Sequence, residues 1–276
     1  MPFKTMLGII GADHSDADAK SAIKLCRDAG AHLSVLVLGV AAPPPAGEYA
    51  AVVSDAWLQE RQEAERKLEE RVKQLTALLA RDGLSADVTG EYVEQAWIDM
   101  AVGRHARYAD LTIVGPELAR TAALKSSVLN GVLFEAERPV LIAPEGVEVS
   151  LSPATILVAW NSGLEASRAV RESIELLAGA EAVHVAMVDP EVEENGPEPG
   201  ADIAAYLARH GAKVTVDRVP GLGRSTTDVL MRHAADISAD LVVMGAYGHS
   251  RLRQRIFGGV TRSVIEDTPM PVLMAR

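Results

Sequence analysis

The stretch LVVMGAYGHSRLRQRIFGGVT, residues 241–261, decides the fold of this 276-residue chain. Its apolar start, Leu241–Met244, predicts a strand that is buried on both faces. Gly245, Gly248 and Gly258 follow, and the residues after Gly258 have helical character. A strand, a glycine-rich loop and a helix start together present backbone N–H groups to an anion, and glycines let that anion approach. The stretch therefore predicts an α/β fold with a phosphate-binding loop. The alternative is that the glycines only shape a tight strand-to-helix turn.

The spacing of those glycines, G-x-x-G-x9-G, resembles the nucleotide loop of the universal stress protein family, in which Ser or Thr comes next. The preceding strand and the closing stretch TPMPVLM, residues 268–274, make the resemblance more specific. Gly259 stands where the family has Ser or Thr, which is a departure. Three arginines at positions 251, 253 and 255 add positive charge to the same loop. The resemblance covers nearly the whole chain and implies a nucleotide-binding protein.

The composition limits the class of protein. A formal net charge of −11 argues against a nucleic-acid binder, because such proteins need a basic face. No apolar run reaches the ~18 residues of a membrane helix, so we expect no membrane association. The only cysteine, Cys26, allows no intrachain disulfide, and the N-terminal residues lack a signal-peptide pattern. These features together predict a cytoplasmic protein.

An internal repeat divides the chain into two predicted domains, residues 1–148 and 149–276. The recurring apolar segments are residues 5–10 with 155–160, 31–38 with 181–188, 109–115 with 239–245, and 138–143 with 270–275. Helical patterns alternate with these strands, notably over residues 15–29, 54–81, 95–107 and 201–210. Such alternation predicts two tandem doubly wound parallel-sheet domains of flavodoxin-like type. The resemblance implies that they are of the adenine-nucleotide-binding kind.

Ligands of doubly wound sheets bind at the carboxyl ends of the strands, where the strand order reverses. In the second domain this place lies between the first strand and the loop after the fourth. The resemblance implies that Asn161 takes the position of a family Asp that holds the nucleoside, flanked by Ala159 and Trp160. It implies that Val188 lines the adenine. The residues it assigns to the phosphates and sugar are Met244, Gly245, Tyr247, Gly248, Gly258, Gly259, Val260 and Thr261.

Asn161 and Trp160 allow more than one role. Asn161 can hydrogen-bond a ribose but brings no negative charge, which weakens the preference for ATP over other adenine nucleotides. It also removes a carboxylate that could attract a metal. Trp160 has an equally good alternative role as an ordinary aromatic side chain at a strand end. The seven histidines show no metal-ligand spacing, so we predict no metal site.

The first domain lacks the glycine pattern. Its corresponding loop, residues 115–128, is shorter, with Leu118 and Ser126 in place of two of the glycines. Pro116 has no N–H to offer, and Glu117 would repel a phosphate. We therefore predict that the first domain binds no triphosphate. In the second domain, Ser225 or Thr226 is the expected N-cap of a helix that precedes the glycine loop.

The sequence thus predicts a protein that binds ATP or another adenine nucleotide, with or without Mg²⁺, in stress response or signalling. No residue is well placed to activate a water, so robust catalysis is not expected and no catalytic residue is assigned. The alternatives are a slow ATPase and a nucleotide-free scaffold for protein interactions. By analogy with the family, residues 140–143 and 272–275 should pair antiparallel and form a pseudo-dimer within one chain. Further homodimerisation stays open.

Overall fold

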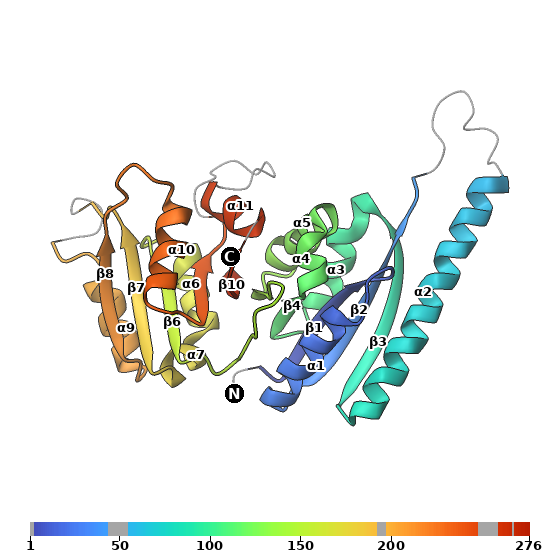
Figure 1. Ribbon diagram of the computed structural model, residues 1–276, viewed down its shortest axis with the longest axis horizontal. Coiled ribbons are helices and arrows are strands. Elements are labelled where there is room, and N and C mark those ends of the chain that lie inside the picture. Colours follow the sequence, from blue (N-terminus) through green and yellow to red (C-terminus); the bar gives the residue numbers. More distant parts are fainter. Residues whose placement is uncertain (1–2, 44–54, 192–196, 248–258, 267) are drawn as a thin grey trace. The chain divides into compact units, whose positions relative to one another are not determined.

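The computed structural model describes residues 3–43, 55–191, 197–247, 259–266 and 268–276. The chain separates into two compact units, residues 3–138 and residues 139–276 (Figure 1). Each unit has a central sheet with helices packed on it, so the α/β doubly wound fold class is confirmed. No helix within the described ranges is both long and apolar enough to cross a bilayer.

The first unit has four parallel strands in the order β3-β2-β1-β4. Its elements are β1 (Thr5–Gly11), α1 (Ala17–Ala29), β2 (His32–Ala41), α2 (Asp55–Asp82), β3 (Ala86–Glu94), a 3₁₀ turn η1 (Gln95–Trp97), α3 (Ile98–Ala106), β4 (Leu111–Val114), α4 (Pro116–Arg120), α5 (Ala122–Asn130) and a π-helical turn η2 (Gly131–Glu135).

The core of this unit follows from its apolar pattern. β1 and β4 are buried along nearly their whole length, as expected for central parallel strands covered on both faces. β3 has only half-buried and exposed residues because it lies at the sheet edge. The helix α1 ends where Gly30 adopts φ +60 and donates its N–H to Arg27 O. Gly30 therefore acts as the helix stop that the sequence predicts.

The second unit has its strands in the order β5-β10-β9-β6-β7-β8. Its elements are β5 (Val140–Ile142), β6 (Thr155–Ala159), α6 (Leu164–Glu172), α7 (Ile174–Gly179), β7 (Ala182–Val188), α9 (Ala201–Arg209), β8 (Val214–Val219), α10 (Thr226–Asp236), β9 (Leu241–Gly245), α11 (Gly259–Glu266) and β10 (Val272–Ala275). β6 to β10 are parallel to one another.

β5 pairs antiparallel with β10, with Leu141 opposite Leu273. The predicted pairing of these two strands is thereby confirmed. The boundary between the compact units falls between residues 138 and 139, whereas the sequence repeat predicts a boundary after residue 148. The reason is β5, which belongs to the first repeat in sequence but hydrogen-bonds to β10 of the second unit. The domain assignment by repeat, the pseudo-dimer and further homodimerisation stay predictions.

One aspartate recurs at the same place in both units. Asp110 Oδ2 accepts the N–H groups of Lys4 and Thr5 at 2.8 and 3.0 Å. Asp240 Oδ2 accepts those of Ala154 and Thr155 at 2.8 and 2.9 Å. The carboxylate that precedes β4 thus fixes the start of β1, and the carboxylate that precedes β9 fixes the start of β6. The two halves share this detail as well as the strand order.

The largest difference from the expected local structure lies after β4. The sequence treats residues 115–128 as a loop, but α4 and α5 fill most of that range. Pro116 is the first residue of α4, a position that suits proline because its missing N–H has no helical partner there. The proline that argues against a phosphate loop therefore begins a helix.

Candidate functional site

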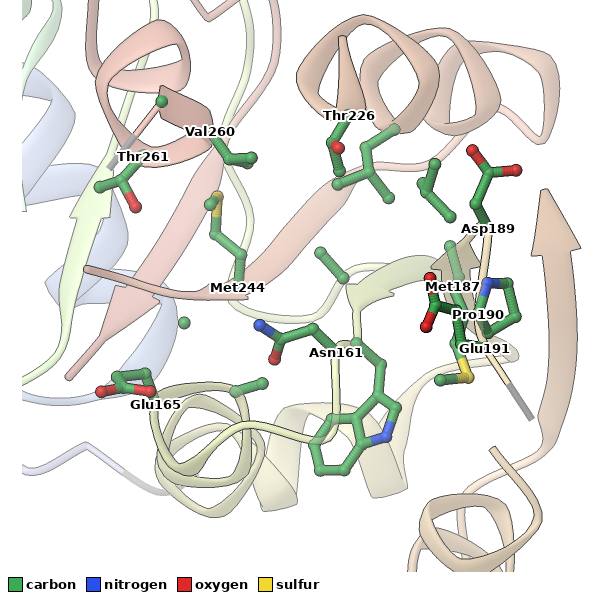
Figure 2. Close-up of a pocket in the computed structure, with 18 residues that line it drawn as sticks. Asn161, Glu165, Met187, Asp189, Pro190, Glu191, Thr226, Met244, Val260 and Thr261 are labelled. Atoms are coloured by element: carbon green, nitrogen blue, oxygen red, sulfur yellow. The ribbon is translucent and has the colours of Figure 1, made fainter. Parts of the chain in front are cut away.

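A pocket of about 410 Å³ opens at the carboxyl ends of β6, β7 and β9 in the second unit (Figure 2). Doubly wound sheets bind ligands at this edge, and the volume lies in the range of small-molecule sites. Its lining residues are Ala159, Trp160, Asn161, Glu165, Ala166, Ala186, Met187, Val188, Asp189, Pro190, Glu191, Thr226, Leu230, Met244, Gly245, Gly259, Val260 and Thr261.

The pocket brings together most of the residues expected at a nucleotide site. Those in its lining are Ala159, Trp160, Asn161, Val188, Met244, Gly245, Gly259, Val260 and Thr261. Tyr247 is not among the lining residues. Gly248, Gly258 and the three loop arginines lie outside the described residues, as do residues 192–196 of the acidic loop after β7. The expected phosphate loop is thus described only at its two ends.

Gly245 has a packing role that is independent of any ligand. A Cβ on Gly245 would lie 2.4 Å from Ala166 N and 2.6 Å from Glu165 C, well inside contact distance. The end of β9 therefore touches the first turn of α6, and only glycine permits this approach. The contact sets Glu165 and Ala166 into the pocket wall.

Tyr247 and Thr261 join the two described ends of the glycine loop. The N–H of Tyr247 donates to Thr261 Oγ1 at 3.1 Å. Tyr247 has φ +68, a conformation that non-glycine residues seldom adopt. Its side chain is buried, and this burial raises the pKa of the phenol. The backbone of Tyr247 therefore holds the start of the loop against α11, and the ligand contact expected from the sequence stays a prediction.

Asn161 occupies the middle of the pocket (Figure 2). Its Oδ1 accepts the N–H of Gly163 at 3.0 Å, in a turn where Ser162 has φ +61. Gly163 is the N-cap of α6, so the Asn161 side chain shapes the entry into that helix. An asparagine at this point can serve the turn and still present polar atoms to a ribose.

The end of β7 forms the opposite wall. Met187, Asp189, Pro190 and Glu191 lie there, away from Val260 and Thr261 (Figure 2). Asp189 has φ +45, and its Oδ1 accepts the N–H of Gly221 at 2.9 Å. This hydrogen bond joins the ends of the neighbouring strands β7 and β8.

The helix α10 closes the pocket on a third side. Ser225 is its N-cap, since Ser225 Oγ accepts the N–H of Asp228 at 3.1 Å, which settles the choice left open by the sequence. Thr226 and Leu230 line the pocket. Thr227 Oγ1 lies 3.4 Å from Val260 O and ties α10 to α11.

The family model of the universal stress proteins matches residues 154–276, which include the pocket. Residues 154–276 form a universal stress protein domain. A universal stress protein of Synechocystis sp. is 26% identical over 156 residues, covering 54% of this chain and 50% of that protein. One of Methanocaldococcus jannaschii is 24% identical over 172 residues, covering 56% and 92%. The match therefore spans only half the length of the Synechocystis relative.

The fold comparison extends over the whole chain. The crystal structure of a universal stress protein from Archaeoglobus fulgidus superposes with a TM-score of 0.68 at 18% identity, covering 100% of this chain and 97% of the other. At this identity the likeness concerns the fold alone. The fold of the residues before 154 thus also has a counterpart in that crystal structure.

The first unit differs from the universal stress protein domain at the matching place. Gly115 ends β4 there, and a Cβ on it would lie 2.5 Å from Asp18 Oδ1. Asp18 is 2% exposed and accepts the N–H groups of Glu117 and Leu118 at 2.7 and 3.0 Å. His14 Nδ1 lies 3.1 Å from the same carboxylate. A buried carboxylate and α4 thus stand where the second unit has its pocket wall.

The sequence did not predict half of the residues that line the pocket of the universal stress protein domain. The residues missed are Glu165, Ala166, Ala186, Met187, Asp189, Pro190, Glu191, Thr226 and Leu230. Asp189 could have been found, since a polar residue directly after a buried strand lies at the sheet edge where ligands bind. The contribution of α6 depends on the packing of Gly245 and has no local signal. Among the lining residues that the structure describes there are three carboxylates and no lysine or arginine.

Proposed function

We propose that the second unit binds an adenine nucleotide and that the chain is a tandem universal stress protein acting in stress response or signalling. One observation carries this proposal: the carboxyl ends of β6 and β7 and the start of α11 line the same pocket. The family membership of residues 154–276 supports it. Binding, rather than rapid turnover, is the proposed activity.

The chemistry of the lining suits a nucleoside. Apolar side chains, including Met187, Val188 and Leu230, offer a surface for a flat base at the β7 end. Asp189 and Glu191 lie at that same end and could accept the amino protons of adenine (Figure 2). Asn161 and Thr226 offer polar groups for the ribose between the two ends.

The opposite end suits an anion. Gly259 and Val260 begin α11, where helix N–H groups have no helical partner and the helix dipole is positive. A Cβ on Gly259 would meet no described residue within 4 Å, which leaves room for a phosphate beside this backbone as far as those residues go. The phosphates therefore extend toward α11, as the glycine spacing in the sequence suggests.

Glu165 sets a condition on phosphate binding. Its carboxylate is part of the wall at the end where Thr261 lies (Figure 2). Two negative groups close together repel unless a cation lies between them or beside them. We therefore expect ATP to bind more tightly with Mg²⁺ than without it. AMP, which carries fewer charges, should depend less on the cation.

Calorimetric titration of the whole chain with ATP, ADP, AMP and adenosine, each with and without Mg²⁺, tests the proposal. A Thr226→Trp variant fills the pocket from an exposed position at the start of α10 and should abolish binding. Ala235→Trp, exposed on the same helix but outside the pocket, is the matched control and should bind normally. No binding of any adenine compound at millimolar concentration would refute the proposal.

The same protein variants can be used to measure ATP hydrolysis. Phosphate release from ATP should stay near the uncatalysed rate because we propose binding without robust catalysis. Steady release that Thr226→Trp removes and Ala235→Trp retains would instead identify a slow ATPase at this pocket.

A further inference from the structure

A cluster of two histidines and one aspartate lies in the second unit, outside the pocket lining. His184 is on β7, Asp217 on the neighbouring strand β8, and His233 on α10, which packs on β7 (Figure 1). His184 Nδ1 lies 2.8 Å from Asp217 Oδ2, and His233 Nε2 lies 2.7 Å from the same oxygen. The three residues each offer one donor atom, and these atoms all lie within 4.8 Å of one another.

We propose that His184, Asp217 and His233 form a binding site for a divalent transition metal of the zinc type. Two imidazole nitrogens and one carboxylate oxygen are the ligand set that Zn²⁺ uses when a fourth position remains for water. With neutral imidazoles the cluster carries one negative charge, which a dication more than neutralises. The hard cations Mg²⁺ and Ca²⁺ prefer all-oxygen sites and suit this set less well.

The geometry needs only a small adjustment. Zn–N and Zn–O bonds of about 2.0–2.2 Å place tetrahedral ligands roughly 3.3 Å apart. The observed N–O separations of 2.7 and 2.8 Å would therefore open by about half an ångström around the ion. Side-chain rotation can supply this change, since the two imidazole planes already meet at 78° with their centres 6.5 Å apart. The strands and α10 need not move.

The partial exposure of the three side chains also suits a metal site with a water ligand. The side chains of His184, Asp217 and His233 are 22%, 20% and 19% exposed. An ion could enter without unfolding of the unit, and its fourth position could be filled by solvent. The protein would still surround most of the ion.

The first unit supplies an internal comparison. Strand register makes Ser34 the counterpart of His184 and Thr89 the counterpart of Asp217. Counting from Asp110 and Asp240, which hold equivalent strand starts, Gly103 is the counterpart of His233. All three ligands are therefore particular to the second unit. The repeated fold does not require any of them.

A second group of donor atoms, His14, Asp18 and Glu117, is less suited to bind an ion. Both oxygens of Asp18 already accept backbone N–H groups of α4. Glu117 Oε2 accepts both the N–H and the hydroxyl of Ser15 at 2.9 and 2.7 Å. Asp217 Oδ2, in contrast, is shared by two imidazoles that can each turn a lone pair toward a metal.

Calorimetric titration of the whole chain with Zn²⁺ alone tests the proposal. A chelator first removes any bound metal from the protein. We expect one Zn²⁺ per chain and a rise in melting temperature with zinc. His184→Asn and His233→Gln keep an amide N–H that can donate to Asp217, so each should fold. Each should weaken zinc binding by at least about 100-fold, since even indirect contacts to a metal ligand are worth about 10–100-fold.

Two controls separate this site from others. His105→Ala removes a histidine of the first unit whose Nε2 lies 2.8 Å from Glu91 Oε1 on β3, and it should leave zinc binding unchanged. His14→Asn tests the second group and should also have no effect. Visible d–d absorption of bound Co²⁺ should show a four-coordinate site and vanish in His233→Gln. Zinc binding that survives both His184→Asn and His233→Gln, or no zinc binding by the folded chain, would overturn the proposal.

Discussion

The backbone N–H of Tyr247 donates to Thr261 Oγ1 at 3.1 Å, across segment 248–258. Tyr247 comes two residues after β9, and Thr261 is in the first turn of α11. One hydrogen bond thus holds the two described ends of the glycine loop together. The threonine also lines the pocket, so loop closure and the proposed anion site depend on the same side chain.

Thr261→Val should weaken both the unit and nucleotide binding. The change removes the acceptor of a buried N–H, and an unpaired buried N–H costs about 1–3 kcal/mol. Chemical unfolding measures the loss of stability, and titration with ATP measures the loss of affinity. Ser263→Ala is the matched control on the same helix, where an exposed hydroxyl contacts Gly259 O, and it should cost less than about 0.5 kcal/mol. Equal effects of the two substitutions would contradict the role given to Thr261.

Gly245→Ala should destabilise the second unit. Its Cβ would lie 2.4 Å from Ala166 N, and overpacking of this kind costs about 1–3 kcal/mol. Gly259→Ala is the control, because its Cβ would meet none of the residues that the structure describes and alanine favours helix by up to about 1 kcal/mol. Thermal unfolding of the two variants compares them directly. A Gly245→Ala variant as stable as the parent would show that β9 and α6 do not pack as described.

Asp110→Ala and Asp240→Ala should each destabilise their own unit. Each substitution leaves two N–H groups at a strand start without their carboxylate, and hydrogen bonds to a charged group contribute about 1.5–3 kcal/mol. Hydrogen exchange resolved along the chain should show faster exchange in β1 for the first variant and in β6 for the second. Asp236→Ala, an exposed change in the last turn of α10, should alter neither. Loss of protection in both units from one substitution would argue against separate anchors.

The Cys26 thiol should be unreactive in the folded chain. Burial raises its pKa from 9.0 to about 12, so little thiolate forms at neutral pH. Because the folded pKa is raised, the stability that Cys26 contributes is complete below pH 9.0 and falls as the pH rises toward about 12. The stability difference between the parent and Cys26→Ala should shrink over that interval. Rapid labelling of the folded chain by a thiol reagent, or a constant difference, would disagree with this burial.

Local patterns in the sequence predicted the central strands well because β1, β4, β6 and β9 are short apolar runs. They also predicted Gly30 as a helix stop and the pairing of residues 140–143 with 272–275. They failed where the outcome depends on contacts distant in sequence. Residues 115–128 look like a degenerate loop, yet Asp18, about a hundred residues earlier, caps α4 through the N–H groups of Glu117 and Leu118.

In the pocket, too, the residues that local sequence patterns predicted differ from those that depend on distant contacts. Asn161, Val188 and Gly245 could be placed because strand ends in a doubly wound sheet meet at one edge. The walls from α6 and α10 could not, since they depend on how each helix packs on the sheet. No spacing rule predicts the cluster of His184, Asp217 and His233, because its members come from two strands and a helix. The register of β7 and β8 and the packing of α10 on β7 bring them together.

The central claim is that the second unit, and not the first, holds an adenine nucleotide. A crystal of the whole chain soaked with ATP and Mg²⁺ tests it most directly. The account predicts density for one nucleotide, with its base near Val188, its ribose near Asn161 and its phosphates at the start of α11. Nucleotide density beside Asp18 and α4 of the first unit, or a pocket in the second unit that stays without density at saturating ATP, would contradict it.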